Sequence, residues 1–220
     1  WRNHGTAVMG ELRGADNGFG VRGIVPDCAV GGSSAGAQSV SGAILSAVSA
    51  LAPGDLVLIE LHAPGPNATG EGQFGFVCME FWQDIFDAIQ VATAAGVVVC
   101  EAAGNGYQDL DDPIYHDLFD RDQRDSGAIL IGATAGGSLD PADFSNHGAR
   151  VDCNGWGYFV TTAAYGDLQG GDDETVWYTS YFSGTSSASP IVTGAAASLQ
   201  GMVKAAFGVP LNAYLMRHVL

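Results

Sequence analysis

Apolar residues recur at helical spacing in the segment 40–51 and then become almost continuous. The helical set consists of Val40, Ile44, Leu45, Val48 and Leu51. It ends at Pro53-Gly54, and the run Leu56–Leu61 follows with almost no polar interruption. A period near 3.6 residues predicts a helix, whereas a short apolar run bounded by a turn predicts a buried strand.

The same alternation returns further along the chain. Phe81, Ile85, Phe86 and Ile89 predict a second helix that stops near Gly96. Val97–Val99 and Ala128–Ala133 predict two more buried strands. Buried strands that alternate with amphipathic helices are typical of a parallel sheet covered on both faces. We therefore predict the α/β class, as a three-layer sandwich with a mostly parallel central sheet. In such sheets functional groups gather at the carboxyl ends of the strands, which directs attention to the segment after Val99.

Composition excludes several functions. The 220 residues, of which 47% are hydrophobic, fit one globular domain with enough core to fold. There are 24 acidic residues against 8 basic ones, a net charge of −16, and Lys204 is the single lysine. Phosphate groups are bound by clustered lysine and arginine, so we predict neither a nucleic-acid partner nor an anionic membrane surface. No apolar run approaches the roughly 18 residues that cross a bilayer.

The sequence at both ends of the chain indicates that the domain is interrupted there. The first residue is Trp1, and the last stretch, Tyr214–Leu220, still has apolar residues at roughly helical spacing. We interpret residues 1–220 as a single domain that is incomplete at the N-terminus and at the C-terminus. The missing leader peptide therefore says nothing about secretion.

The four cysteines are Cys28, Cys78, Cys100 and Cys153, without a C-x-x-C pair. This spacing gives no support to a zinc or thioredoxin-like site and leaves three disulfide pairings open. Cys78 precedes a predicted helix and Cys100 closes the next strand, so both lie near one sheet edge. A Cys78–Cys100 bridge is one hypothesis, and buried free thiols are the other.

Carboxylates cluster in two segments. Asp109–Asp125 holds seven aspartates, and Asp167–Glu174 holds four carboxylates. Either segment could bind calcium, but the spacing does not fit an EF-hand loop, and a solvated surface is the favoured interpretation.

Two familiar motifs are predicted to be coincidental. Gly18–Gly23 spells G-x-G-x-x-G but runs into Ile24-Val25-Pro26 where a dinucleotide site needs a helix. Gly32–Gly36 spells G-x-S-x-G, the nucleophile elbow of α/β-hydrolases, with Ser34 as its serine. Too little chain precedes it for the strands and oxyanion loop of that fold, so an esterase using Ser34 is the weaker alternative.

Three other segments combine more specifically. They are His4–Gly10, which begins a helix, Glu101–Gly106, which leaves a buried strand, and Ser183–Pro190, which begins a long Ala-rich helix. In this order, with H-G-T, A-A-G-N-G and G-T-S-x-A-S-P, the chain resembles the subtilisin-like serine protease family from His4 to about Met202. The resemblance implies the subtilisin-like fold and a serine endopeptidase that forms an acyl-enzyme.

The resemblance also implies roles for individual residues. Ser186 is expected to be the nucleophile, His4 the general base and Asn105 the side-chain donor to the oxyanion. A serine hydroxyl needs a positioned base to take its proton, and an imidazole that titrates near neutrality can accept that proton and return it to the leaving amine. Taken one at a time, these residues would be read as an ordinary polar histidine, a turn asparagine and a helix cap.

The substrate groove is a further implication of the resemblance. Leu61, His62 and Ala63 are expected to pair with the backbone of an extended peptide, and Ala102, Ala103 and Gly104 to form a wall of the pocket. Pro64 replaces a glycine that is common in the family, and it has no N–H to donate.

One expected residue has no counterpart in this chain. The family's catalytic aspartate precedes H-G-T on a strand, and only Trp1, Arg2 and Asn3 precede His4. We expect an active parent protein and an impaired isolated chain, because imidazole orientation is lost without the acid. A noncatalytic binding domain of the same fold is the alternative.

The remaining expectations concern partners. The resemblance implies peptide or protein substrates and no cofactor for the chemistry, with a structural calcium site near Ala15–Val21 as an open alternative. The acidic, lysine-poor composition favours a secreted protein, with a saline habitat as the other interpretation, and we expect a monomer.

Overall fold

The computed structural model describes residues 2–36 and 38–220, which form five α-helices and eight strands. Four strands make the central sheet in the order β1-β4-β5-β6, and every neighbouring pair is parallel. These strands are β1 (Leu56–Ile59), β4 (Val98–Ala102), β5 (Ile129–Thr134) and β6 (Cys153–Trp156). Strand β4 is buried at every residue, as expected for a parallel strand covered on both faces.

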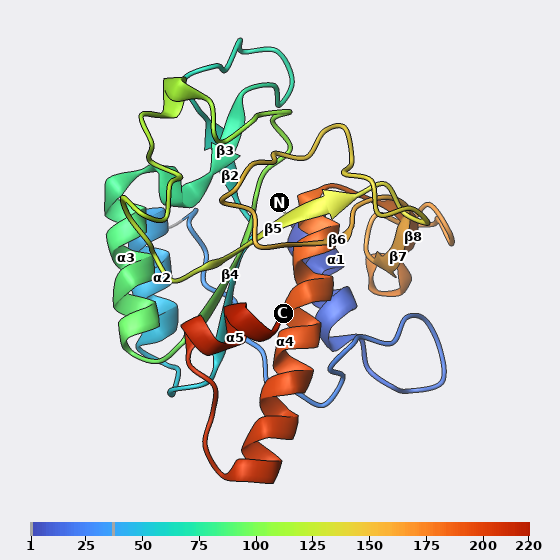
Figure 1. The fold of residues 1–220 in the computed structure, drawn as a ribbon. Coiled ribbons are helices and arrows are strands. Elements are labelled where there is room, and N and C mark those ends of the chain that lie inside the picture. Colours follow the sequence, from blue (N-terminus) through green and yellow to red (C-terminus); the bar gives the residue numbers. More distant parts are fainter. Residues whose placement is uncertain (1, 37) are drawn as a thin grey trace.

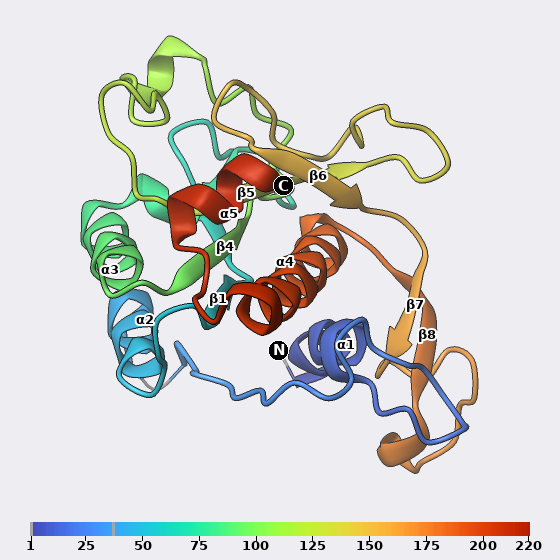
Figure 2. The same ribbon diagram turned by 60° about the horizontal axis from the view of Figure 1, so that its bottom comes forward.

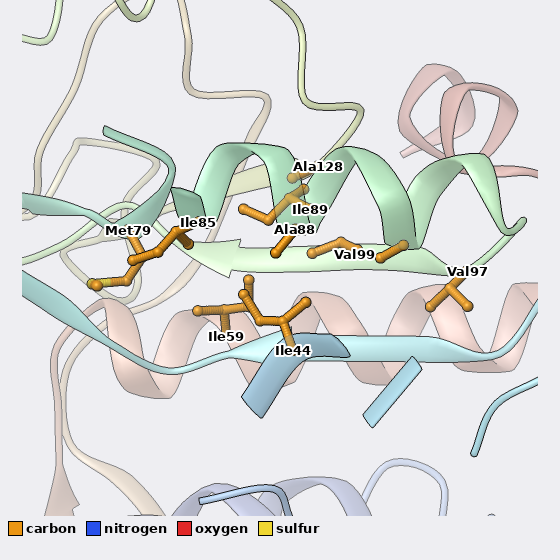
Figure 3. Close-up of a cluster of buried hydrophobic side chains, with 10 residues drawn as sticks. Ile44, Ile59, Met79, Ile85, Ala88, Ile89, Val97, Val99 and Ala128 are labelled. Carbon is orange, nitrogen blue, oxygen red and sulfur yellow. The ribbon is translucent and has the colours of Figure 1, made fainter. Parts of the chain in front are cut away.

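Two helices cover one face of the sheet. They are α2 (Val40–Val48) and α3 (Gln83–Ala94), which lie side by side (Figures 1 and 2). Ile85 and Ile89 of α3 and Ile44 of α2 pack against Ile59 of β1 and Val99 of β4 (Figure 3). The apolar residues that recur at helical spacing in the sequence are therefore the ones that face the sheet.

The opposite face is covered by the C-terminal helices. Helix α4 (Thr185–Phe207) runs across the sheet, and α5 (Ala213–Val219) packs beside it (Figure 2). Val192 of α4 and Met216 of α5 meet Ile131 of β5 in the core on this side. The predicted α/β three-layer sandwich is confirmed.

Helix α1 (Arg2–Arg13) lies against α4 on the same side (Figures 1 and 2). Ala7, Val8 and Leu12 form a small buried cluster with Phe182. The helix expected at His4 begins two residues before it, so His4 sits in the first turn. This packing brings the start of the chain next to the start of α4.

Two antiparallel pairs complete the fold. They are β2 (His62–Pro64) with β3 (Phe76–Cys78), and β7 (Val160–Ala163) with β8 (Tyr178–Phe182). The predicted strand Leu56–Leu61 is wrong in its last two residues. The ladder with β4 ends at the pair Ile59–Glu101, and from His62 the chain pairs with β3 instead.

Strand β6 was not predicted from the sequence. Only Gly155 of its four residues is buried, so it has no apolar run to reveal it. A Cβ at Gly155 would lie 2.3 Å from the carbonyl oxygen of Ala188. The glycine therefore allows the start of α4 to approach the sheet closely.

The four cysteines are free thiols, so the Cys78–Cys100 bridge is not formed. The carboxylates of both acidic segments are solvent-exposed, apart from Asp125, which is partly buried beside Arg217. Within residues 2–36 and 38–220, no group of three or more histidine, cysteine or acidic side chains is arranged to hold a metal ion. None of the described helices combines the length and apolar character needed to span a membrane.

A charged cluster lies beside β4, with Arg150, Glu80 and Glu101 buried and Asp152 half-buried. Arg150 donates two hydrogen bonds to the carboxylate of Glu80, at 2.6 and 2.8 Å, and one to Asp152 at 2.7 Å. The Glu80 N–H donates to Glu101 Oε1 at 2.9 Å. The paired charges compensate each other's desolvation and tie the turn after β3 to β4 and to the segment before β6.

Candidate active site

A cavity of about 510 Å³ opens between the first turn of α1 and the first turn of α4. It is lined by residues from six segments of the chain: His4, Glu60, Leu61, His62, Gln73, Asn105, Tyr165, Asp167, Thr179, Tyr181, Phe182, Ser183 and Ser186. The residues that follow β1 and β4 supply its floor, at the carboxyl ends of parallel strands. The rule for open α/β sheets thus locates the cavity correctly.

Ser186 occupies the second position of α4 and is half-buried at the cavity wall. Gly184 precedes the helix with φ of 106°, a conformation that L side chains rarely adopt. The N–H groups of a helix's first turn have no intrahelical acceptor, and the helix dipole adds positive potential there. The Ser186 N–H is such a group.

Asn105 is oriented by the same helix start. Its Oδ1 accepts hydrogen bonds from the N–H and the hydroxyl of Thr185, both at 2.8 Å. Because Oδ1 must face these two donors, Nδ2 faces the other way. A Cβ built on Gly184 would lie 3.0 Å from Asn105 Nδ2 and 3.5 Å from Ser186 N. Both donor nitrogens therefore lie next to the space that a side chain at position 184 would fill, and Asn105 Oδ1 lies 3.4 Å from the same point.

The turn that carries Asn105 is held by a buried asparagine that sequence reasoning missed. Asn146 donates to the carbonyls of Ala103 and Phe76 at 2.7 and 2.9 Å, and its Oδ1 accepts from the N–H groups of Gly106 and Gln108. The Asn146 side chain is 1% exposed, so each of these bonds is shielded from water. Nothing in the local sequence distinguishes it from an ordinary loop asparagine.

A second feature missed from the sequence is Gln73. Its Oε1 accepts a hydrogen bond from Asn105 Nδ2 at 3.3 Å. The exposed Gln73 side chain thus occupies one of the two N–H donors of Asn105 Nδ2.

His4 reaches the cavity from α1. Its ring stands edge-on to Phe182, with the centroids 5.6 Å apart. Burial lowers the pKa of His4 below its ordinary value, so the imidazole is neutral at pH 7. Among the described residues, no carboxylate forms a hydrogen bond or an ion pair with His4.

His62 is held in a different way. Its Nδ1 accepts a hydrogen bond from the N–H of Asn105 at 3.1 Å, and its ring stands edge-on to Phe76. Burial, together with the nearby His4, lowers the pKa of His62 to about 4. A neutral His62 with Nδ1 as acceptor is thus part of the Asn105 turn.

Two buried carboxyl groups belong to this region, Glu60 in the cavity lining and Glu11 on α1, and nothing in the sequence singles them out. Glu60 follows β1 and accepts a close contact from the hydroxyl of Ser189, one turn along α4 from Ser186. Its Oε2, and both carboxyl oxygens of Glu11 on α1, are buried without a partner among the described residues. Burial raises the pKa of Glu60 to about 8, and burial together with Glu60 raises that of Glu11 to about 9.

The residues expected in the substrate groove divide into two groups. Leu61 and His62 line the cavity, and Gly104 lies against the His62 side chain. Ala102 and Ala103 are buried, and neither belongs to the cavity lining. Ala63 pairs with Val77 across the β2–β3 ladder, so one edge of this strand is occupied by the chain itself.

Ser34 lies outside the cavity. It is exposed in a loop, no described strand leads into it, and it is not part of the cavity lining. A nucleophile elbow requires a strand-to-helix turn, so the geometry contradicts the esterase alternative.

Comparison with known proteins adds an independent line of evidence. A family model described as the subtilase family matches residues 1–220. Subtilisin Savinase from Lederbergia lenta is 30% identical over 200 residues, which cover 88% of this chain and 61% of that protein. An alkaline protease from Alkalihalobacillus alcalophilus is also 30% identical over 200 residues, and 43% of it is covered. An extracellular serine proteinase of Thermus is 37% identical over 115 residues, half of this chain and 23% of that one.

Solved structures give the same fold. A cold-adapted subtilisin-like serine proteinase aligns over 99% of this chain and 66% of its own length, with a TM-score of 0.65 and 21% identity. The PatG macrocyclase in complex with peptide aligns over 99% of this chain and 58% of its own, with a TM-score of 0.68 and 19% identity. The chain spans about a quarter to three fifths of the curated relatives it matches.

Proposed function

Because this chain belongs to the subtilase family, a family of serine proteases, we propose that it is the part of a serine endopeptidase that carries nucleophile, base and oxyanion donors. Its substrates are peptides or proteins. The observation that carries the proposal is that Asn105 Nδ2 and the Ser186 backbone nitrogen both lie beside the space that Gly184 leaves open. A carbonyl oxygen that gains negative charge fits between two such donors.

The reaction follows from these positions. Ser186 Oγ attacks the carbonyl carbon of the scissile bond while His4 takes its proton, and the carbonyl oxygen becomes an oxyanion held by the two donors. The C–N bond then breaks as His4 returns the proton to the leaving amine, which leaves an ester on Ser186. A water molecule, deprotonated by His4, hydrolyses the ester and restores the serine.

His4 is the base and His62 is not. The lowered pKa of His4 keeps its imidazole neutral and able to accept a proton at pH 7. The Nδ1 atom of His62 already accepts the Asn105 N–H, and its pKa of about 4 makes it too weak a base. If His62 acted as the base in place of His4, its Nδ1 could no longer accept the Asn105 N–H, and the turn that positions Asn105 would lose this hydrogen bond.

The orienting acid of the triad is proposed to come from sequence before Trp1 in the whole protein. An aspartate in a strand-like context upstream of His4 in the coding sequence supports the enzyme. Its absence from the gene supports the alternative, a noncatalytic binding domain, because His4 has no carboxylate partner among the described residues. The extracellular relative and the acidic composition favour secretion.

A fluorophosphonate probe on the full-length protein tests the proposal. Such a probe phosphonylates an activated serine and leaves an ordinary hydroxyl untouched. Wild type is expected to be labelled, and Ser186→Ala is not. Ser183→Ala is the matched control, because Ser183 lines the same cavity before the helix begins. No labelling of wild type, or equal labelling of wild type and Ser186→Ala, contradicts the catalytic role.

A further inference from the structure

The carboxyl group of Glu60 meets the hydroxyl of Ser189 at the bottom of the active-site cavity. Ser189 Oγ also lies 2.8 Å from the carbonyl oxygen of Thr185, one helical turn back. A serine hydroxyl has one proton, so it can donate to only one of these two oxygens. The other contact needs a proton from elsewhere.

A carboxylate at Glu60 cannot supply that proton. If Glu60 were ionised, Ser189 would donate to it, and the Ser189 and Thr185 oxygens would face each other without a hydrogen. If Glu60 is protonated, it donates to Ser189 Oγ, and Ser189 donates to the Thr185 carbonyl, which satisfies both contacts. The buried and unpartnered Oε2 of Glu60 argues in the same direction, because an ionised group there would carry uncompensated charge.

Among the described residues, the groups that face Glu60 include no cation that would stabilise an ionised carboxylate. Glu11 and His4 face it from α1, His62 faces it from the segment after β1, and α4 presents the hydroxyls of Ser186 and Ser189. Glu11 is another buried acid, and both histidines have a pKa lowered by burial. The surroundings therefore reinforce the neutral form.

We propose that Glu60 is a positioning residue that works only while it is protonated, because its proton orders the first turn of α4 and its ionisation would place a negative charge beside Ser186. This inference rests on the proposed function. The negative charge would oppose the oxyanion that forms at the N-terminus of the same helix. Loss of the proton would also break the Glu60–Ser189–Thr185 chain that holds that turn.

The test compares the pH dependence of Ser186 labelling in the full-length protein and its Glu60→Gln variant. Glutamine has the shape of a protonated glutamate, and its Nε2 can donate to Ser189. The pKa of about 8 at Glu60 predicts a wild-type labelling rate that falls roughly ten-fold or more between pH 7 and pH 9.5. Glu60→Gln is expected to keep its rate over this range. An alkaline fall of equal size in both proteins overturns the proposal.

Glu11→Gln is the matched control, because it removes the other buried carboxyl and leaves Glu60 in place. The alkaline fall is expected to persist there. If it disappears in Glu11→Gln and persists in Glu60→Gln, the proposal is overturned. Should Glu60→Gln fail to fold, Glu60→Met gives an uncharged side chain of similar length for a buried site, and the alkaline fall must be absent from it.

A measurement that needs no activity separates this inference from the proposed function. Carbon NMR of ¹³C-labelled glutamate carboxyls identifies Glu60 by the resonance that Glu60→Gln lacks. This resonance is expected to titrate with a midpoint of about 8, even if wild type reacts with no probe. A midpoint near the ordinary value for glutamate overturns the inference on its own.

Discussion

Thr185 holds Asn105 by two hydrogen bonds across 80 residues of sequence, from its backbone N–H and its hydroxyl to the same Oδ1 atom, both 2.8 Å long. Thr185 Oγ1 in turn accepts a bond from the N–H of Gly104 at 3.2 Å. The start of α4 and the turn after β4 are thereby locked together. The two donors that face the cavity are consequently preorganised before any substrate binds.

Replacing Asn105 by alanine removes one of these donors. We expect the kcat for peptide hydrolysis to fall by about 10²–10³ with little change in KM, the magnitude known for the corresponding change in subtilisin itself. The reason is that the lost hydrogen bond forms fully only with the oxyanion. Steady-state kinetics of the full-length enzyme measure both constants, with the exposed Asn17→Ala as control. An equal fall in both variants, or a change confined to KM, contradicts the assignment.

Replacing Gln73 by alanine should raise the rate at which the probe labels Ser186. Gln73 Oε1 accepts a hydrogen bond from Asn105 Nδ2, which carries two N–H donors, so Gln73 competes with a substrate oxygen for one of them. A net hydrogen bond of about 0.5–1.5 kcal/mol corresponds to a two- to ten-fold gain in the rate of probe labelling. Gln90→Ala on the outer side of α3 serves as control. A slower Gln73→Ala enzyme would mean that Gln73 assists the reaction instead of competing for the donor.

Asn146→Ala is expected to destabilise the fold by about 3 kcal/mol, because it leaves two carbonyls and two N–H groups buried without partners. Denaturant unfolding measures the loss. Labelling of Ser186 should fall in parallel, since the Asn105 turn is no longer held. Asn146→Asp keeps the acceptor and loses both donors, so an unchanged stability in that variant argues against the importance of the Ala103 and Phe76 carbonyls.

Stability should decline as pH rises, and Glu11 is a cause. The pKa of Glu11 is raised from its ordinary 4.5 to about 9, so the folded state holds a proton that the unfolded state releases between these values. Folding therefore loses stability through this window as pH increases. We expect Glu11→Gln to lose about 4 kcal/mol less than wild type between pH 6 and pH 9, as measured by denaturant unfolding. The exposed Glu71→Gln is the control, and identical pH slopes for Glu11→Gln and wild type contradict this account.

The sequence predicts the layers of this fold better than it predicts the site. Apolar periodicity placed α2, α3, β4 and β5 to within a few residues, because each buries a face of its own. Strand β6 escaped detection because its packing depends on a single glycine under α4. The strand predicted over Leu56–Leu61 is two residues too long, because from His62 the chain pairs with β3, whose residues lie 12 to 16 positions further along the sequence.

The site residues also fall into two groups, those that the local sequence identifies and those that depend on distant contacts. His4, Asn105 and Ser186 were singled out because their motifs are local, and the structure brings all three to one cavity, while their catalytic roles stay predictions. The local sequence does not identify Glu60, Gln73 and Asn146 as site residues. The role of each depends on a contact with a segment that is distant in the sequence. Glu60 reads in sequence as one polar residue within an apolar run.

The most direct measurement is acid-quench trapping of the acyl-enzyme during turnover of a peptide ester by the full-length protein, followed by peptide mapping with mass spectrometry. An acyl group on the peptide that contains Ser186, absent from Ser186→Ala, is the predicted result. Turnover with no acyl adduct on Ser186, or with the adduct on another residue, would contradict the account.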